Sequence, residues 1–118
     1  MLLLDQRGTR ASITRTTAAN PALLSFTGAC TGSDAAEAVY MNFTIDGTTV
    51  LGSTNGIIMS QPNVSEYMNC SLVAMSSDLT AGSHTFKFQW ARASGTGTLT
   101  MVCGTTNACQ FWVAEVTD

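Results

Sequence analysis

The residues that could carry acid–base or nucleophilic chemistry are few, and His84 is the only histidine in the chain. A Ser/His/Asp triad can be assembled on paper from Ser83, His84 and Asp78. However, Ser83 and His84 are neighbours at the start of one expected strand, where adjacent side chains point to opposite faces. We therefore expect no catalysis here and interpret His84 as a structural residue at the entrance of a strand.

Cofactor and metal chemistry finds little support in the remaining residues. The eight acidic residues are scattered over expected loops and strand ends, so no two carboxylates share a strand face as glycoside hydrolysis requires. Gly95 and Gly97 lie between expected strands, and no helix follows them as in a phosphate-binding loop. The chain has no C-x2-C pair to join its single histidine in a zinc site. The sequence predicts a protein that is not an enzyme and has neither a metal nor a cofactor.

The four cysteines Cys30, Cys70, Cys103 and Cys109 permit three pairings. Residues 1–5 offer too short an apolar run for a secretory leader, and disulfides persist mainly in oxidising compartments, so free buried thiols are the default expectation. Cys103 and Cys109 flank a loop of hairpin composition, and they are the candidate disulfide. Such a small closed loop would add about 2 kcal/mol to stability.

Composition limits the kinds of partner. A chain of 118 residues fits one domain, and its 11% of charged residues is well below the roughly 25% of ordinary soluble domains. We therefore expect a partner to cover part of the surface. The net charge of −3 argues against nucleic acid, which needs a basic patch. No apolar stretch is long enough for a membrane-spanning helix, so no membrane partner is expected.

Apolar and polar residues alternate with a period of two through most of the chain, which is typical of β-strands. These strands must position the histidine, the acids and the cysteines discussed above. The run 84–92 puts His84, Phe86, Phe88 and Trp90 on one face, with polar residues on the other. No amphipathic helix is credible. These features predict an all-β antiparallel β-sandwich with a jelly roll as first candidate and an immunoglobulin-like sandwich as runner-up. The expected strands are 22–27, 37–46, 48–51, 56–60, 67–75, 84–92, 98–103 and 109–116.

The N-terminal segment differs in composition from the rest. Residues 1–17 contain three of the four arginines on a polar Thr/Ser background with little to bury. Pro21 disfavours helix in the residue before it. We therefore predict an extended arm over residues 1–21 and a sandwich domain over residues 22–118.

Adjacent aromatic residues give the best sign of a second buried surface. Phe111 and Trp112 must point to opposite faces of the last strand, so one of them faces away from the core. Together with Tyr40 and Tyr67, Trp112 is a candidate for a subunit interface, which we favour, or for a ligand patch that stacks sugar rings.

A family resemblance lies in the segment 79–90, LTAGSHTFKFQW, and the following Gly95-x-Gly97-Thr98-Leu99. This segment, about a fifth of the chain, resembles a pattern in the small virion jelly rolls of tailed bacteriophages, which include capsid decoration (cement) proteins, head fibres and tail-fibre tips. Similar turn–strand sequences occur in the jelly rolls of the tumour-necrosis-factor and complement-globular-head class. The resemblance implies a homotrimeric jelly roll without catalytic residues, and an arm that grips capsid subunits.

From this resemblance we expect a non-enzymatic capsid decoration protein, made in the host cytoplasm, that binds the outer surface of the phage head and stabilises it. Its partners would be the major capsid protein and two further copies of itself. The alternative is a receptor- or carbohydrate-binding tip domain of a phage tail fibre. The residues expected to contact the capsid are Leu2, Leu3, Leu4, Arg7, Arg10 and Arg15.

Overall fold

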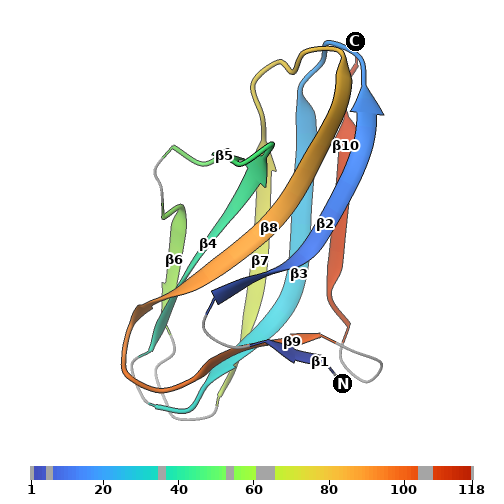
Figure 1. Cartoon of the computed structure of the whole chain (residues 1–118). Coiled ribbons are helices and arrows are strands. Elements are labelled where there is room, and N and C mark those ends of the chain that lie inside the picture. Colours follow the sequence, from blue (N-terminus) through green and yellow to red (C-terminus); the bar gives the residue numbers. More distant parts are fainter. Residues whose placement is uncertain are drawn as a thin grey trace.

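The computed structural model of the chain contains two packed antiparallel sheets (Figure 1). Alternating apolar residues of both sheets meet between them in the core. For residues 2–4, 7–11 and 60 the structure describes the backbone alone. The part of the chain that the structure describes contains strands and no helix, which confirms the predicted all-β sandwich. The described residues are 2–4, 7–34, 37–52, 55–60, 66–103 and 108–117.

One sheet, here called the β8 sheet, is centred on the strand with the aromatic row. Its order is β2-β8-β4-β5, and β6 also pairs with β4. Ile45 pairs with Thr48 across the two-residue turn Asp46-Gly47, whose φ values of 51° and 86° suit a type I′ hairpin. Its strands are β2 (Arg7–Thr17), β4 (Ala38–Ile45), β5 (Thr48–Thr49), β6 (Ile57–Ser60) and β8 (Gly82–Ser94).

The second sheet, the β3 sheet, is built around its longest strand. β7 pairs with one edge of β3 over residues 23–31. Two shorter strands divide the other edge, β10 along residues 22–27 and β9 along residues 29–32, and they meet end to end at Gly28. The strands are β1 (Leu2–Leu4), β3 (Ala22–Gly32), β7 (Tyr67–Met75), β9 (Leu99–Cys103) and β10 (Gln110–Glu115).

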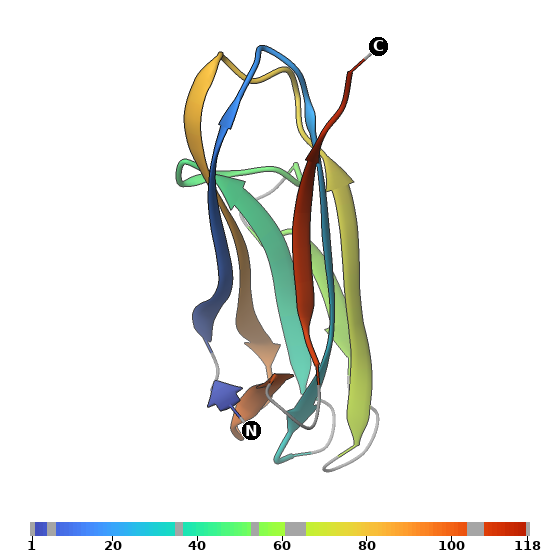
Figure 2. The same cartoon turned by 90° about the vertical axis from the view of Figure 1, so that its right-hand side faces the viewer.

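Figure 2 shows the two sheets side-on. An aromatic column forms the centre of the core between them. Phe88 is fully buried and stacks on Phe26 of the opposite sheet, with ring centroids 3.6 Å apart. Phe43 and Trp90 pack against the same ring at 5.8 Å and 6.1 Å. Aromatic pairs of this kind contribute about 0.5–1.5 kcal/mol beyond the area that they bury. The predicted inward row of β8 is confirmed.

Strand β4 departs from the predicted half-buried pattern. Asn42 and Thr44, expected on the solvent face, are 5% and 4% exposed. The chain after β5 covers this face, because the Asn42 amide donates to the carbonyl oxygen of Leu51 and its Oδ1 accepts the Leu51 backbone N–H at 3.1 Å. A polar residue on a strand therefore need not face solvent when a loop returns over it.

The predicted arm is not separate from the sandwich, so the division between residues 21 and 22 is corrected. β2 pairs with β8 from Arg7↔Ala91 to Thr17↔Gly82, and β1 pairs with β9. Backbone hydrogen bonds to a neighbouring strand do not require apolar side chains, which is why the polar composition of the segment concealed the strand.

Candidate functional site

The outer face of the β3 sheet carries a row of side chains that faces away from the core. Val73 of β7 pairs with Ser25 of β3, and Ser25 pairs with Trp112 of β10. Directly paired residues of antiparallel strands point to the same side of the sheet, so the three side chains form one row. Val73 is 61% exposed and Trp112 is 44% exposed, whereas the small Ser25 between them is only 7% exposed.

A second row continues this surface toward the end of β7. Met75 pairs with Leu23, and Leu23 pairs with Ala114. Met75 is 53% exposed, and Leu23 and Ala114 are half-buried. We call these two rows the outer apolar patch; its members are Leu23, Ser25, Val73, Met75, Trp112 and Ala114.

The adjacent aromatic residues of β10 behave as predicted. Phe111 points inward and stacks near Phe43, with ring centroids 5.8 Å apart, while Trp112 stands on the outer face. The prediction that one of the pair faces away from the core is confirmed.

The three aromatic residues predicted for one interface or ligand patch do not come together. Tyr67 shares the outer face with Trp112, but it lies six residues along β7 from Val73, roughly 20 Å away. Tyr40 lies on the other sheet, where it pairs with Ile58 and Ala91. A period of two assigns faces within a strand but does not tell which sheet the strand joins, so it could not place Tyr40 relative to Trp112.

His84 forms an ion pair that the sequence did not suggest. Its Nδ1 lies 2.6 Å from Oδ2 of Asp46, and its Nε2 lies 2.7 Å from the carbonyl oxygen of Thr80. The type I′ turn places Asp46 because Ile45 pairs with Phe86 beside it, and the backbone N–H of Thr85 donates to Oδ1 of Asp46 at 2.8 Å. This pairing depends on the register of β4 and β8, which no local pattern in the sequence specifies.

The surroundings of His84 favour its charged form. The carbonyl oxygen of Thr80 and then the carboxylate of Asp46 raise the pKa of His84 above its ordinary value. The Thr85 N–H and then the His84 ring lower the pKa of Asp46. Because a carbonyl oxygen can only accept, Nε2 carries a hydrogen, and an ionised Asp46 calls for a second one on Nδ1. These hydrogen bonds favour an imidazolium–carboxylate pair.

This arrangement leaves His84 no free nitrogen to act as a general base. Ser83 is exposed on the opposite side of β8, and the hydrogen bonds of His84 go to Asp46 and Thr80 rather than to Asp78. The structure therefore does not assemble the triad that can be drawn on paper.

A hollow of about 320 Å³ adjoins the ion pair and is lined by the β4–β5 hairpin and by the residues that precede β8. Its wall combines aliphatic side chains with hydroxyl groups and two carboxylates. Such a lining can hydrogen-bond a polar organic molecule while contacting its apolar parts. The lining residues are Ile45, Asp46, Thr48, Thr49, Val50, Ser76, Ser77, Asp78, Leu79, Thr80 and His84.

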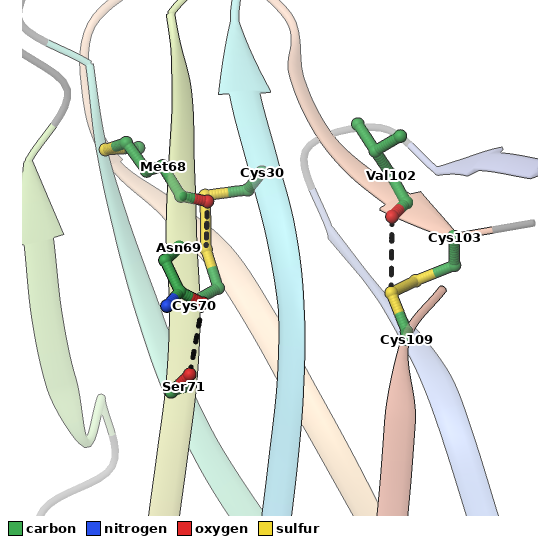
Figure 3. The surroundings of a disulfide bond; sticks show 8 residues. All are labelled: Cys30, Met68, Asn69, Cys70, Ser71, Val102, Cys103 and Cys109. Carbon is green, nitrogen blue, oxygen red and sulfur yellow. Dashed lines mark hydrogen bonds between the residues drawn. A yellow bond between two sulfur atoms is a disulfide. The ribbon is translucent and has the colours of Figure 1, made fainter. Parts of the chain in front are cut away.

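All four cysteines are paired, which overturns the default of free thiols (Figure 3). The candidate Cys103–Cys109 disulfide is confirmed, with Cα atoms 5.2 Å apart. Cys30 and Cys70 form a second disulfide at a Cα separation of 6.3 Å, on the inward side of β3 and β7. Forty residues separate this pair, so only the register of the two strands reveals it.

The Cys103–Cys109 disulfide closes the junction where β9 and β10 meet along β3. A Cβ added to Gly28 would lie 2.7 Å from Sγ of Cys109 and 3.1 Å from the Phe26 ring. Figure 3 shows Sγ of Cys109 directed toward the carbonyl oxygen of Val102, 3.2 Å away. Glycine is therefore the residue that leaves room for this sulfur.

The residues predicted to contact a capsid are only partly described. The guanidinium of Arg15 donates to the carbonyl oxygen of Val113 at 3.1 Å, which joins β2 to β10. The backbones of Leu2–Leu4, Arg7 and Arg10 lie in β1 and β2, while their side chains are outside the described residues.

Comparison of the chain with protein-family models, with curated proteins and with solved structures gives no match. Within the described ranges, no helix has the length and apolar character needed to cross a membrane.

Proposed function

We propose that the chain is a non-enzymatic structural protein of a bacteriophage virion, a decoration protein that binds the outer surface of the head as a homotrimer. The observation that carries this proposal is the outer apolar patch. It joins three strands of one sheet face and exposes Val73, Met75 and Trp112 by 44% to 61%. Contiguous exposed apolar surface of this kind marks interaction sites.

Self-association through the patch suits its composition. Aromatic residues and methionine are enriched, and charged residues depleted, at the centres of protein interfaces. The six members of the patch include no charged residue, in a chain with only 11% charged residues. A symmetric oligomer would bury the same patch of every copy.

The phage assignment rests on the resemblance of residues 79–99 to virion jelly rolls, and the trimeric jelly roll is implied by the same resemblance. The segment covers β8 and the start of β9, which belong to different sheets of the sandwich. The two disulfides add support, because disulfides persist in oxidising surroundings such as the surface of a virion.

The mechanism of stabilisation would be mass action. A trimer that binds the assembled shell but not free capsid subunits stabilises the shell by RT ln(1 + [L]/Kd). Once one subunit of the trimer is bound, the other two are held close to neighbouring capsid sites, which raises their effective concentration there. Because β1 and β2 belong to the sandwich, we propose that these two strands contact the capsid as part of the sheet rather than as an arm. Arg15 keeps further guanidinium donors for a carboxylate on the capsid.

Immunogold electron microscopy of the virions that carry the protein tests the assignment, with antibodies raised against the purified chain. Labelling over the head surface is the expected result. Labelling at the fibre tips would transfer the proposal to the alternative, and unlabelled virions would refute both. Light scattering on the purified chain tests the oligomer separately, with an expected mass of three times the 12.4 kDa of one chain.

The alternative, a receptor- or carbohydrate-binding tip of a tail fibre, is favoured by a different observation. The hollow beside His84 is lined by hydroxyl groups and carboxylates, and Tyr67 is 68% exposed on another part of the surface. A glycan array tests this function. The function would be supported by glycan binding that is lost in Thr49→Trp, which fills the hollow, or in Tyr67→Ala. Absence of binding to any glycan of the array would count against it.

A further inference from the structure

A buried glutamate at the opposite end of the sandwich has an unused oxygen. Glu37, just before β4, is 0% exposed. Its Oε2 accepts the backbone N–H of Asp34 at 3.3 Å, while its Oε1 has no hydrogen-bond partner among the described residues. A buried carboxylate without a partner is costly, and buried charges in proteins are normally paired or bound to a metal.

Glu37 and a second carboxylate, that of Asp34, both lie beside the turn formed by residues 95–97. A Cβ added to Gly95 would lie 2.5 Å from Cγ and 3.2 Å from Oε1 of Glu37, and one added to Gly97 would lie 2.8 Å from Oδ2 of Asp34. The Thr96 hydroxyl between the two glycines donates to the same Oδ2 at 3.1 Å. The turn therefore places its backbone against both acids and leaves no room for larger residues.

The neighbouring arginine does not neutralise Glu37. Arg92 donates through Nη1 to the carbonyl oxygen of Gly97. Within the described residues, Glu37 forms no ion pair, and the ion pair that is found there joins His84 to Asp46 at the other end of the molecule. The negative charge of the cluster is thus uncompensated by a side chain in direct contact.

We propose that Asp34 and Glu37 bind a calcium ion. Carboxylate, hydroxyl and carbonyl oxygens are the ligands that this hard cation prefers, and its variable coordination number accepts water at the remaining positions. Zinc does not fit, because among the described residues no three His, Cys, Asp or Glu side chains converge. Oε1 of Glu37 and the carboxylate of Asp34 would be the protein's anionic ligands.

The position of the site gives the ion a structural role. The β3–β4 connection carries Asp34 and Glu37, and the β8–β9 connection carries the glycine turn; both lie at the lower end of Figure 1. Each connection runs from one sheet to the other. A cation held here would tie the two crossovers together at the end opposite the His84–Asp46 pair. This inference does not depend on the proposed virion function.

Thermal unfolding of the EDTA-treated full chain, with and without calcium, tests the proposal. At calcium about 100-fold above the dissociation constant, Tm should rise by about 5 °C or more. Magnesium should give a smaller shift because it requires stricter geometry and sheds water reluctantly. Glu37→Gln should abolish the calcium shift and Asp34→Asn should weaken it. Asp78→Asn, an exposed acid in the hollow near His84, is the matched control and should respond like wild type.

Calorimetric titration of the wild-type chain keeps the proposal testable if Glu37→Gln fails to fold. Saturable heat at about one ion per chain, with a dissociation constant below about 1 mM, is expected for a site of this kind. The absence of both heat and Tm shift at about 10 mM calcium, well above the weakest extracellular sites, would overturn the proposal. An equal calcium shift in wild type and Glu37→Gln would overturn it as well.

Discussion

Trp112 and Val73 lie in one row across the outer face of the β3 sheet, on opposite sides of the buried Ser25. β3 lies between their strands, and its small Ser25 side chain leaves both larger side chains exposed in the same row. The row converts two isolated exposed residues into one continuous surface, and this continuity distinguishes the outer apolar patch from the scattered apolar residues of an ordinary surface.

Charged substitutions in this row should separate the subunits. Trp112→Glu and Val73→Glu place a carboxylate at the centre of the proposed interface, where burial without a partner is costly. We expect each to reduce the oligomer to a chain of 12.4 kDa in light scattering. Ser83→Glu, an exposed position on the other sheet, should leave the oligomer intact. Trimers that persist in both patch variants would place the interface elsewhere.

Phe111 and Trp112, adjacent in β10, should contribute differently to the stability of the single chain. On the monomeric Val73→Glu background, Phe111→Ala removes an inward ring beside Phe43 and should lower the free energy of unfolding by about 3 kcal/mol. Trp112→Ala on the same background should cost less than about 1 kcal/mol, since the ring is 44% exposed. Urea unfolding measures both, and equal losses would show that Trp112 also stabilises the single chain.

The two disulfides should contribute unequally. In the chain-entropy description, the loop closed by Cys30–Cys70, with a separation of 40, stabilises by about 4 kcal/mol, and the Cys103–Cys109 loop, with a separation of 6, by about 2 kcal/mol. Replacing Cys30 and Cys70 together by alanine should therefore cause the larger fall in unfolding free energy. Peptide mapping without reduction should first identify both pairs. A larger loss from the Cys103/Cys109 double variant would contradict the entropic account.

Stability should depend on pH through His84 and Asp46. The raised pKa of His84 gives stabilisation that is complete below about pH 6.5 and is lost as pH rises through the folded-state pKa. The lowered pKa of Asp46 gives stabilisation that is present above about pH 4 and is lost as pH falls through its folded-state value. The contribution of the pair should therefore be greatest between about pH 4 and pH 6.5.

A titration followed by NMR can check this directly, because His84 is the only histidine in the chain. Its imidazole should titrate above about pH 6.5, the ordinary histidine value. Asp46→Asn keeps a residue that tolerates the positive φ of the turn, and it should move the titration toward lower pH. Asp78→Asn should change it little. A wild-type midpoint at or below the ordinary value would show that the ion pair does not hold in solution.

The comparison between sequence and structure shows which kinds of contact a local pattern can predict. The alternation in β8 identified its buried face, and the adjacency of Phe111 and Trp112 showed that one of the two rings faces outward. Burial is a property of single positions, so a period of two reveals it. Strand β2 was missed because its polar residues give no such period, although its backbone pairs with β8 from Arg7 to Thr17 with one irregularity between Thr9 and Ala11.

The missed parts of the candidate site all depend on register between distant strands. The Cys30–Cys70 disulfide requires the pairing of β3 with β7, and the His84–Asp46 pair requires that of β4 with β8. Register also places Val73 opposite Ser25. Register is set by the packing of the whole sandwich, and the sequence of either strand alone leaves it open.

The junction at Gly28 has a mechanical consequence. β9 and β10 lie end to end along one edge of β3, and the Cys103–Cys109 bridge joins them across the meeting point. Tension applied at the C-terminus enters β10 first. The covalent path through the two sulfur atoms then passes the load to β9. Both strands must shear from β3 together, so two short strands resist pulling as one long strand would.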